Sequence, residues 1–279
     1  METSSGVGRG RTDSVQQIFG RPRGVVIGVI HCPPFPGSPR FQGASSEALY
    51  EAALADALAY AAGGVDGLII ENHGDVPFSK PDDIGHETSA FMAVTADRIK
   101  RETGLPFGIN VLANAAIPAL AIAAASQAAF VRVNQWANAY VANEGLIEGA
   151  AALALRYRAR LRADGIRVFA DAHVKHGAHA IVADRSLEEL VRDVEFFDAD
   201  AIIATGQRTG DAASADYLRQ MRAATTLPLL VGSGCSERNV AEILSIVDAV
   251  IVASSLKVGG VWWNPVEEAK VRAFMKAAR

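Results

Sequence analysis

The chain has 279 residues, of which 50% are hydrophobic and 21% are charged, so it can bury a sizeable core and is not globally disordered. Its formal net charge of −4 argues against a general nucleic-acid scaffold, and its two cysteines cannot build a disulfide framework, which favours a reducing compartment. Because no apolar run approaches the roughly 20 residues that span a bilayer, we expect no transmembrane segment and a cytoplasmic protein. The lack of a basic excess leads us to expect no nucleic-acid partner.

Residues 1–20 are predicted to form an N-terminal extension, flexible apart from a short helix over residues 13–19 that Gly20 ends. From Gly24 onward, short runs rich in Val and Ile alternate with Ala-rich runs of helical periodicity. Such short apolar runs are typical of parallel strands that are covered on both faces. The eight predicted strands span residues 25–30, 67–70, 107–111, 130–133, 167–172, 201–205, 229–231 and 249–252. The helices that follow them are predicted at residues 46–62, 87–102, 115–126, 146–162, 186–197, 215–225, 237–245 and 265–278.

Eight alternations of strand and helix predict an α/β protein with a (β/α)8 TIM barrel over residues 21–279, in a single domain. The alternative is an open, doubly wound sheet. That fold usually has a Gly-rich turn after its first strand. The chain instead has a proline-rich loop there, which begins at His31, so we favour the barrel.

Residues that can do acid–base chemistry gather at the predicted carboxyl ends of the strands, where barrels of this fold build their active sites. All six histidines and both cysteines fall at that face. Strand alternation points one set of polar side chains into the barrel mouth, and a lysine follows two residues later. The candidate catalytic residues are His31, Glu71, Asn110, Arg132, Asn134, Asp171, His173 and Lys175.

These candidates have distinct expected roles. Asp171 and His173 would transfer protons, with Glu71 as a second carboxylate. Arg132 and Lys175 would stabilise negative charge, and we favour this role for Lys175 over a Schiff base. The two asparagines would orient hydroxyl groups. The alternative is a structural ion-pair network that fixes the strand ends.

A metal site is a further hypothesis for the same face. Asp171 and His173, joined by Glu71 or His31, supply ligands suited to a divalent metal. No zinc signature matches the spacing, so the cofactor stays open. The candidate metal ligands are Glu71, Asp171 and His173.

Small residues follow the last strands, where barrels commonly bind phosphate. Glycine lets an anion approach the backbone, and serine adds a hydroxyl donor. The alternative is that these residues only make tight turns. The candidate phosphate-binding residues are Gly206, Gly232, Ser233, Gly234, Ser254 and Ser255.

Three long loops, at residues 31–45, 72–85 and 135–144, are expected to wall the pocket or to make surface contacts. Near the C-terminus, Trp262 and Trp263 could serve either as a pocket wall or as an oligomer patch, and they are the hint of a homo-oligomer.

The chain resembles the BtpA/SgcQ family from about residue 24 to about residue 272. The segments that carry the resemblance include Val29-Ile30-His31, Glu71-Asn72-His73-Gly74-Asp75, Ala170-Asp171-Ala172-His173-Val174-Lys175-His176 and Val231-Gly232-Ser233-Gly234. The resemblance implies a barrel. One branch of the family is named for photosystem I biogenesis, and another sits among sugar-transport and sugar-metabolism genes. The family has Asn-Asp after its third strand, where this chain reads Ala113-Asn114-Ala115 and so lacks a carboxylate.

These observations predict an enzyme of the isomerase, lyase or hydrolase type that acts on a small phosphorylated metabolite such as a sugar phosphate. The alternative is a non-catalytic assembly or stability factor of the photosystem I biogenesis type.

Overall fold

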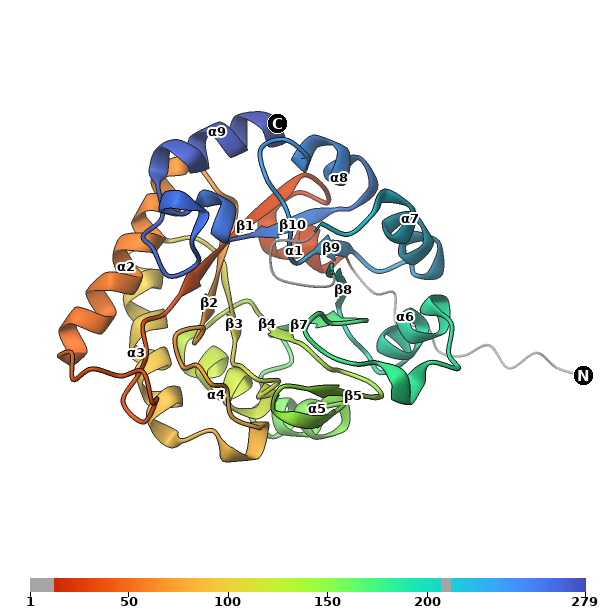
Figure 1. The fold of residues 1–279 in the computed structure, drawn as a ribbon, viewed down its shortest axis with the longest axis horizontal. Coiled ribbons are helices and arrows are strands. Elements are labelled where there is room, and N and C mark those ends of the chain that lie inside the picture. The colour runs from red at the N-terminus through yellow and green to blue at the C-terminus, as the bar shows by residue number, and fades with distance from the viewer. Residues whose placement is uncertain (1–12, 207–211) are drawn as a thin grey trace, which may run out of the picture.

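A closed barrel of eight parallel strands forms the centre of the computed structural model, which describes residues 13–206 and 212–279 (Figure 1). Neighbouring strands follow the order β1-β10-β9-β8-β7-β4-β3-β2, so the first and last strands pair and close the ring. The predicted TIM barrel is thereby confirmed. The barrel strands are β1 (Val25–His31), β2 (Gly67–Glu71), β3 (Phe107–Asn110), β4 (Phe130–Val133), β7 (Arg167–Asp171), β8 (Ala201–Ala204), β9 (Leu229–Val231) and β10 (Ala249–Val252).

Helices form an outer ring around these strands (Figure 1). Several begin at a serine cap, such as Ser45 and Ser186, whose hydroxyl accepts a hydrogen bond from a backbone N–H of the first turn. The ring helices are α2 (Ser46–Gly63), α3 (His86–Thr103), α4 (Ala116–Ser126), α5 (Ala151–Arg160), α6 (Leu187–Phe196), α7 (Ala215–Ala224), α8 (Val240–Ile246) and α9 (Glu268–Ala278). Short 3-10 turns are η1 (Pro81–Asp83), η2 (Ala180–Val182), η3 (Ser254–Leu256) and η4 (Val258–Gly260).

Strand alternation divides the core into two layers. In β1, Val26 and Ile30 belong to the large cluster between strands and helices, whereas Val25, Ile27 and Val29 belong to the cluster inside the barrel. The inward-facing residues fill the lower barrel with apolar side chains. Polar groups that continue this inward row therefore lie at the carboxyl ends of the strands.

A short helix, α1 (Ser14–Phe19), lies across the amino-terminal end of the barrel. Val15 is fully buried in the inner core, and the Phe19 ring meets Phe130 edge-on at 6.1 Å. Asp13 caps the helix and Gly20 ends it in the left-handed conformation. Residues 1–12 of the extension predicted over residues 1–20 lie outside the described residues.

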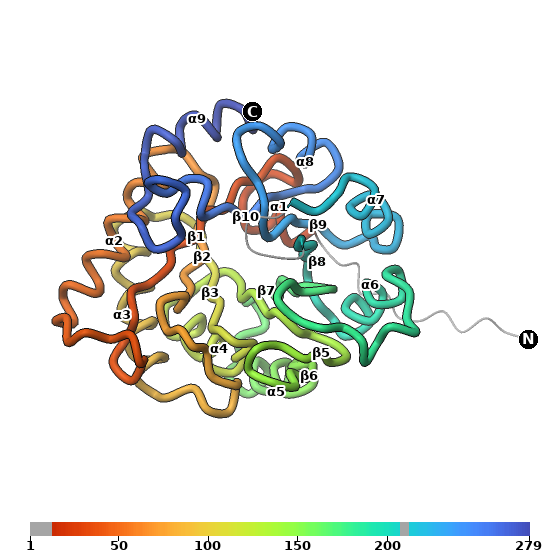
Figure 2. The backbone as a smooth tube through the Cα atoms, in the orientation of Figure 1, coloured from red at the N-terminus to blue at the C-terminus, as the bar shows by residue number. Residues whose placement is uncertain are grey.

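A two-stranded antiparallel hairpin, β5 (Ala139–Ala142) and β6 (Gly145–Glu148), follows β4 and was not predicted. The predicted helix start at residue 146 is wrong, because residues 145–148 form the second strand and α5 begins at Ala151. Val141 also pairs with Ala178, which ties the hairpin to the loop after β7 (Figure 2). The hairpin therefore stands over one side of the barrel mouth. Within the described residues, no helix is both long and apolar enough to cross a membrane.

Candidate functional site

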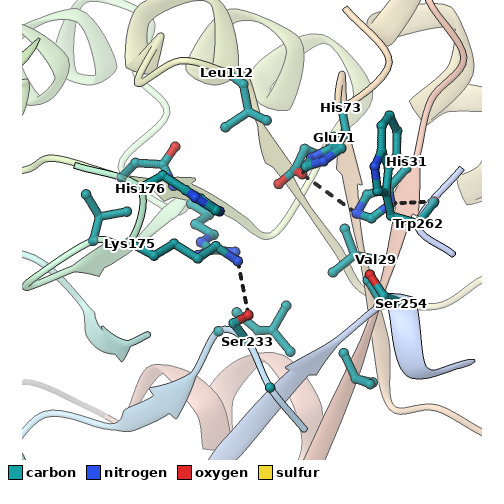
Figure 3. Close-up of a pocket in the computed structure, with 18 of the residues that line it drawn as sticks. Val29, His31, Glu71, His73, Leu112, Lys175, His176, Ser233, Ser254 and Trp262 are labelled. Carbon is teal, nitrogen blue, oxygen red and sulfur yellow. Dashed lines mark hydrogen bonds and ion pairs between the residues drawn. The ribbon is translucent and has the colours of Figure 1, made fainter. Parts of the chain in front are cut away.

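A cavity of about 710 Å³ opens at the carboxyl ends of the barrel strands. Its lining comes from all eight barrel strands or the loops that follow them, and Figure 3 shows some of these residues. The three long loops all contribute to its wall, for example through Arg40, Phe78 and Tyr140. Trp262 and Trp263 also line the cavity. The polar groups at its base are His31, Glu71, His73, Arg132, Asn134, Lys175, Ser233 and Ser254.

His31, Glu71 and His73 form a compact cluster on one side of the cavity (Figure 3). His73 Nδ1 lies 2.7 Å from Glu71 Oε1, and His31 Nε2 lies 3.8 Å from the same oxygen. The two imidazole rings stack at 4.4 Å. His31 Nδ1 lies 2.9 Å from the carbonyl oxygen of Trp262. Because a carbonyl oxygen only accepts, Nδ1 carries the proton in this contact.

His73 was not among the predicted catalytic residues. The inward row of β2 runs Ile69, Glu71 and then His73, which lies beyond the last residue of the strand. Asn72, between them, is not part of this inward row, and its side-chain amide forms two hydrogen bonds with the backbone of Leu112. Continuing the alternation past the strand end would therefore have found His73.

The charges in this cluster follow from burial and from its neighbours. Burial, reinforced by His73, lowers the pKa of His31 to about 3. Burial alone would raise the pKa of Glu71, but the His73 hydrogen bond and the charges of His73, His31 and Arg132 hold it at about 2. At neutral pH the cluster therefore combines an ionised carboxylate with a neutral imidazole at His31.

Arg132 and Asp171 form a bidentate ion pair beneath the cavity. Arg132 Nε donates to Oδ1 at 3.1 Å and Nη2 donates to Oδ2 at 2.9 Å. Asp171 raises the pKa of Arg132 above its ordinary value despite burial of the guanidinium. The Asp171 side chain has no exposed surface, whereas Arg132 lines the cavity. Asp171 is therefore placed to hold Arg132 in position.

The predicted asparagines lie around this pair. Asn134 Nδ2 donates to Asp171 Oδ2 at 3.4 Å, and Asn134 also lines the cavity. Asn110 Nδ2 donates to the Arg132 carbonyl oxygen at 3.0 Å, and Asn110 is buried below the residues that line the cavity. Only Asn134 of the two can thus meet a ligand directly.

Lys175 and Ser233 lie across the cavity from the histidine cluster (Figure 3). Lys175 Nζ donates to Ser233 Oγ at 3.1 Å. Burial and the neighbouring charge of Arg132 lower the pKa of Lys175 to about 8, so its ammonium form still dominates at neutral pH. This side of the cavity therefore carries positive charge.

The glycine-rich turn after β9 lies close to Arg132. A Cβ atom at Gly232 would be 2.7 Å from Ile203 Cγ2 and 3.0 Å from Arg132 Nη2, so only glycine fits without a shift. Gly232, Ser233 and Gly234 all line the cavity, as do Ser254 and Ser255. The Ser255 hydroxyl donates to the Cys235 carbonyl oxygen at 2.8 Å, which joins the two turns. Gly206 is not among the residues that line the cavity.

His173 lies away from the other candidates. β7 ends at Asp171, and the chain then turns, so the inward row of that strand does not continue to His173. Its ring stacks on His179 at 3.8 Å, and His179 stacks in turn on Tyr140 of the hairpin. Burial lowers the pKa of His173 to about 4. Among the described residues, the cavity lining does not include His173.

The predicted metal ligands are therefore not brought together. Among the described residues, one group of metal-ligating side chains has its ligand atoms within 4.8 Å of one another, and it consists of His31, Glu71 and His73. Asp171 and His173 do not belong to this group.

The chain is similar to known proteins both in sequence and in fold. The BtpA family model matches residues 23–279. A protein of Archaeoglobus fulgidus is 42% identical over 254 residues, which cover 91% of this chain and 98% of that one. The photosystem I biogenesis protein BtpA of Synechocystis is 39% identical over 253 residues, which cover 90% and 87%. Among solved structures, tryptophan synthase from M. tuberculosis superposes with a TM-score of 0.60 at 16% identity, over 96% and 99% of the two chains.

Proposed function

Since the chain belongs to the BtpA family and folds as a TIM barrel with a polar cavity at its mouth, we propose that it is an enzyme that acts on a small phosphorylated metabolite. The phosphoryl group would lie at Gly232–Gly234, Ser254 and Lys175. The reacting part of the molecule would lie against His31, Glu71 and His73.

One observation carries this proposal: a positively charged side around Lys175 and a carboxylate–imidazole side around Glu71 face each other across the same cavity (Figure 3). Lys175 supplies an ammonium group, Ser233 a hydroxyl group and Gly232 close access to the backbone. These are the groups that commonly hold a phosphoryl group after the last strands of a barrel. On the opposite side, Glu71 is an ionised carboxylate with access to the cavity.

The chemistry that fits these groups is proton transfer. His73, whose Nδ1 is hydrogen-bonded to Glu71 Oε1 at 2.7 Å, would accept a proton from a substrate carbon or hydroxyl through its Nε2. Glu71 and the unprotonated Nε2 of His31 would accept hydrogen bonds from the substrate. Arg132, held by Asp171, would stabilise the negative charge that develops on the substrate, and Asn134 would orient a hydroxyl group. Isomerisation, aldol-type cleavage and hydrolysis all use such steps.

A thermal-shift screen against phosphate monoesters tests the proposal, since a ligand that binds only the folded state raises its apparent stability. We expect sugar phosphates to raise the Tm and the matching free sugars not to. Ser233→Asp and Lys175→Met should abolish the shift, whereas Lys276→Met, at an exposed position on α9, should keep it. Wild-type protein that gains no stability from any phosphate monoester would contradict the proposal.

A second candidate function comes from the Synechocystis relative, which is named for photosystem I biogenesis. In that case the chain would be a non-catalytic assembly factor that works through its outer surface. Expression of this chain in a Synechocystis strain that lacks the relative separates the two functions. Rescue of photosystem I by both the wild type and Glu71→Gln would favour the assembly role.

A further inference from the structure

We propose that His31, Glu71 and His73 form a binding site for one divalent transition-metal cation of the zinc class. Two imidazoles and one carboxylate are ligands that such cations accept, and three protein ligands leave positions for water or substrate. The site opens onto the cavity, because all three residues line it (Figure 3). Metal binding does not require the phosphate proposal, and it can be measured with the metal alone.

The first argument is the contact between His31 and Glu71. His31 Nδ1–H donates to the Trp262 carbonyl oxygen, so the other ring nitrogen, Nε2, is the one directed at Glu71 Oε1. The 3.8 Å between these atoms is too long for a hydrogen bond. Two ligands with metal bonds of about 2.0–2.2 Å lie about 3.3–3.8 Å apart at the angles of roughly 110–120° found in tetrahedral zinc sites. The pair is therefore spaced for a shared cation.

The second argument is that the surroundings already orient His31. Histidines that bind metals usually donate their second ring N–H to a carboxylate or a backbone carbonyl, which fixes the ring. The Trp262 carbonyl oxygen does this for His31 at 2.9 Å. The side chains of His31 and Glu71 are only 7% and 8% exposed, so packing against the protein restricts the positions of both ligands.

His73 completes the set. Its ring packs edge-on against Trp262 at 4.5 Å and against Phe78 at 5.6 Å. Its Nδ1 now donates to Glu71 Oε1 at 2.7 Å, a hydrogen-bond distance that is shorter than the spacing of two ligands on one ion. His73 would therefore exchange this hydrogen bond for a metal bond when the cation enters.

Two positive charges near the site, those of Arg132 and Lys257, do not oppose a cation strongly, because each is paired with a carboxylate of its own. Arg132 is paired with Asp171. Lys257, which lies near His31, donates to Asp56 Oδ2 at 2.7 Å. The Glu71 carboxylate is thus left to balance the charge of an incoming cation. A bound ion would present its water or a substrate oxygen to the cavity, as a Lewis acid does in hydrolases and aldolases.

Titration of chelator-treated full-length protein with Zn²⁺ and with Co²⁺ tests the proposal. We expect one ion per chain by isothermal titration calorimetry and elemental analysis. Bound Co²⁺ should give the visible absorption bands of a site with nitrogen and oxygen ligands. His31→Ala, Glu71→Gln and His73→Ala should each weaken binding by more than about tenfold. His86→Ala, an exposed histidine at the start of α3, should bind like the wild type.

Two results would overturn the proposal: wild-type protein that binds neither ion, or binding that the three variants leave unchanged. Circular dichroism identifies any variant that fails to fold, and the Co²⁺ spectrum of the wild type does not depend on a variant. Loss of phosphate binding with metal binding intact would contradict the proposed function alone.

Discussion

The guanidinium of Arg132 and the carboxylate of Asp171 meet through two parallel hydrogen bonds of 3.1 and 2.9 Å, with the carboxylate shielded completely from solvent. This geometry places Asp171 behind Arg132 as seen from the cavity. The carboxylate therefore holds the arginine in position, and it has no exposed surface with which to exchange a proton.

Asp171→Asn should therefore destabilise the protein strongly. The substitution leaves the buried charge of Arg132 without its partner, which costs about 3–5 kcal/mol in comparable buried pairs. Urea unfolding measures this loss. The control is Asp216→Asn, which breaks an exposed pair with Arg219 and should cost less than about 1 kcal/mol. Similar free energies of unfolding for the two variants would show that the Arg132–Asp171 pair contributes little to stability.

Gly232→Ala should reduce both stability and phosphate binding. The added methyl group would meet Ile203 and Arg132 at 2.7 and 3.0 Å, and overpacking of this kind typically costs about 1–3 kcal/mol. Gly165→Ala is the matched control, because nothing lies within 4 Å of its Cβ position and its backbone is not in the left-handed region. Thermal unfolding with and without a phosphate monoester measures both effects. A Gly232→Ala protein that binds phosphate like the wild type would place the anion elsewhere.

Binding of a phosphate monoester should weaken as the pH rises through about 8, the lowered pKa of Lys175. The lysine is charged below this value and neutral above it, whereas a monoester remains a dianion above about pH 7. Calorimetry between about pH 7 and about pH 9.5 measures the change. Lys175→Met should bind the monoester weakly, and its affinity should no longer depend on pH in this range. If Lys175→Met keeps the full pH dependence of the wild type, Lys175 is not the group that causes it.

Stability should fall as the pH drops from about 6.5 towards 4. His173 has a pKa of about 4 in the folded protein against its ordinary value of 6.5, so the unfolded chain takes up its proton first. The contribution of His173 to the free energy of unfolding is therefore complete above about pH 6.5 and is lost as the pH falls towards 4. Tm measured across this range should decline less steeply in His173→Gln than in the wild type. His86→Gln, at an exposed site, should follow the wild type.

The sequence could predict the barrel because each strand is a short Val- and Ile-rich run between helices, and parallel strands covered on both faces give that pattern. The hairpin could not be predicted in the same way. Its second strand, Gly145–Glu148, contains Leu146 and Ile147 directly before the Ala-rich start of α5, so local composition does not separate strand from helix. The pairing of Val141 with Ala178 depends on residues far along the chain.

The candidate site was predicted best where side chains lie within strands. Alternation pointed His31, Glu71 and Arg132 toward the cavity, and the structure places all three in its lining. Beyond the strand end the rule holds after one strand and fails after another, because the direction of the backbone there depends on the loop. There the chain after β2 keeps His73 in the inward row, whereas the chain after β7 carries His173 to a stack with His179.

Val15 and Phe19 pack against the inner core and cover the amino-terminal end of the barrel, so within the described residues the cavity opens at the carboxyl end of the strands. The reactant and the product of any reaction in this cavity would then use the same opening. A product molecule would have to depart before the next reactant could enter, so accumulated product is expected to act as a competitive inhibitor.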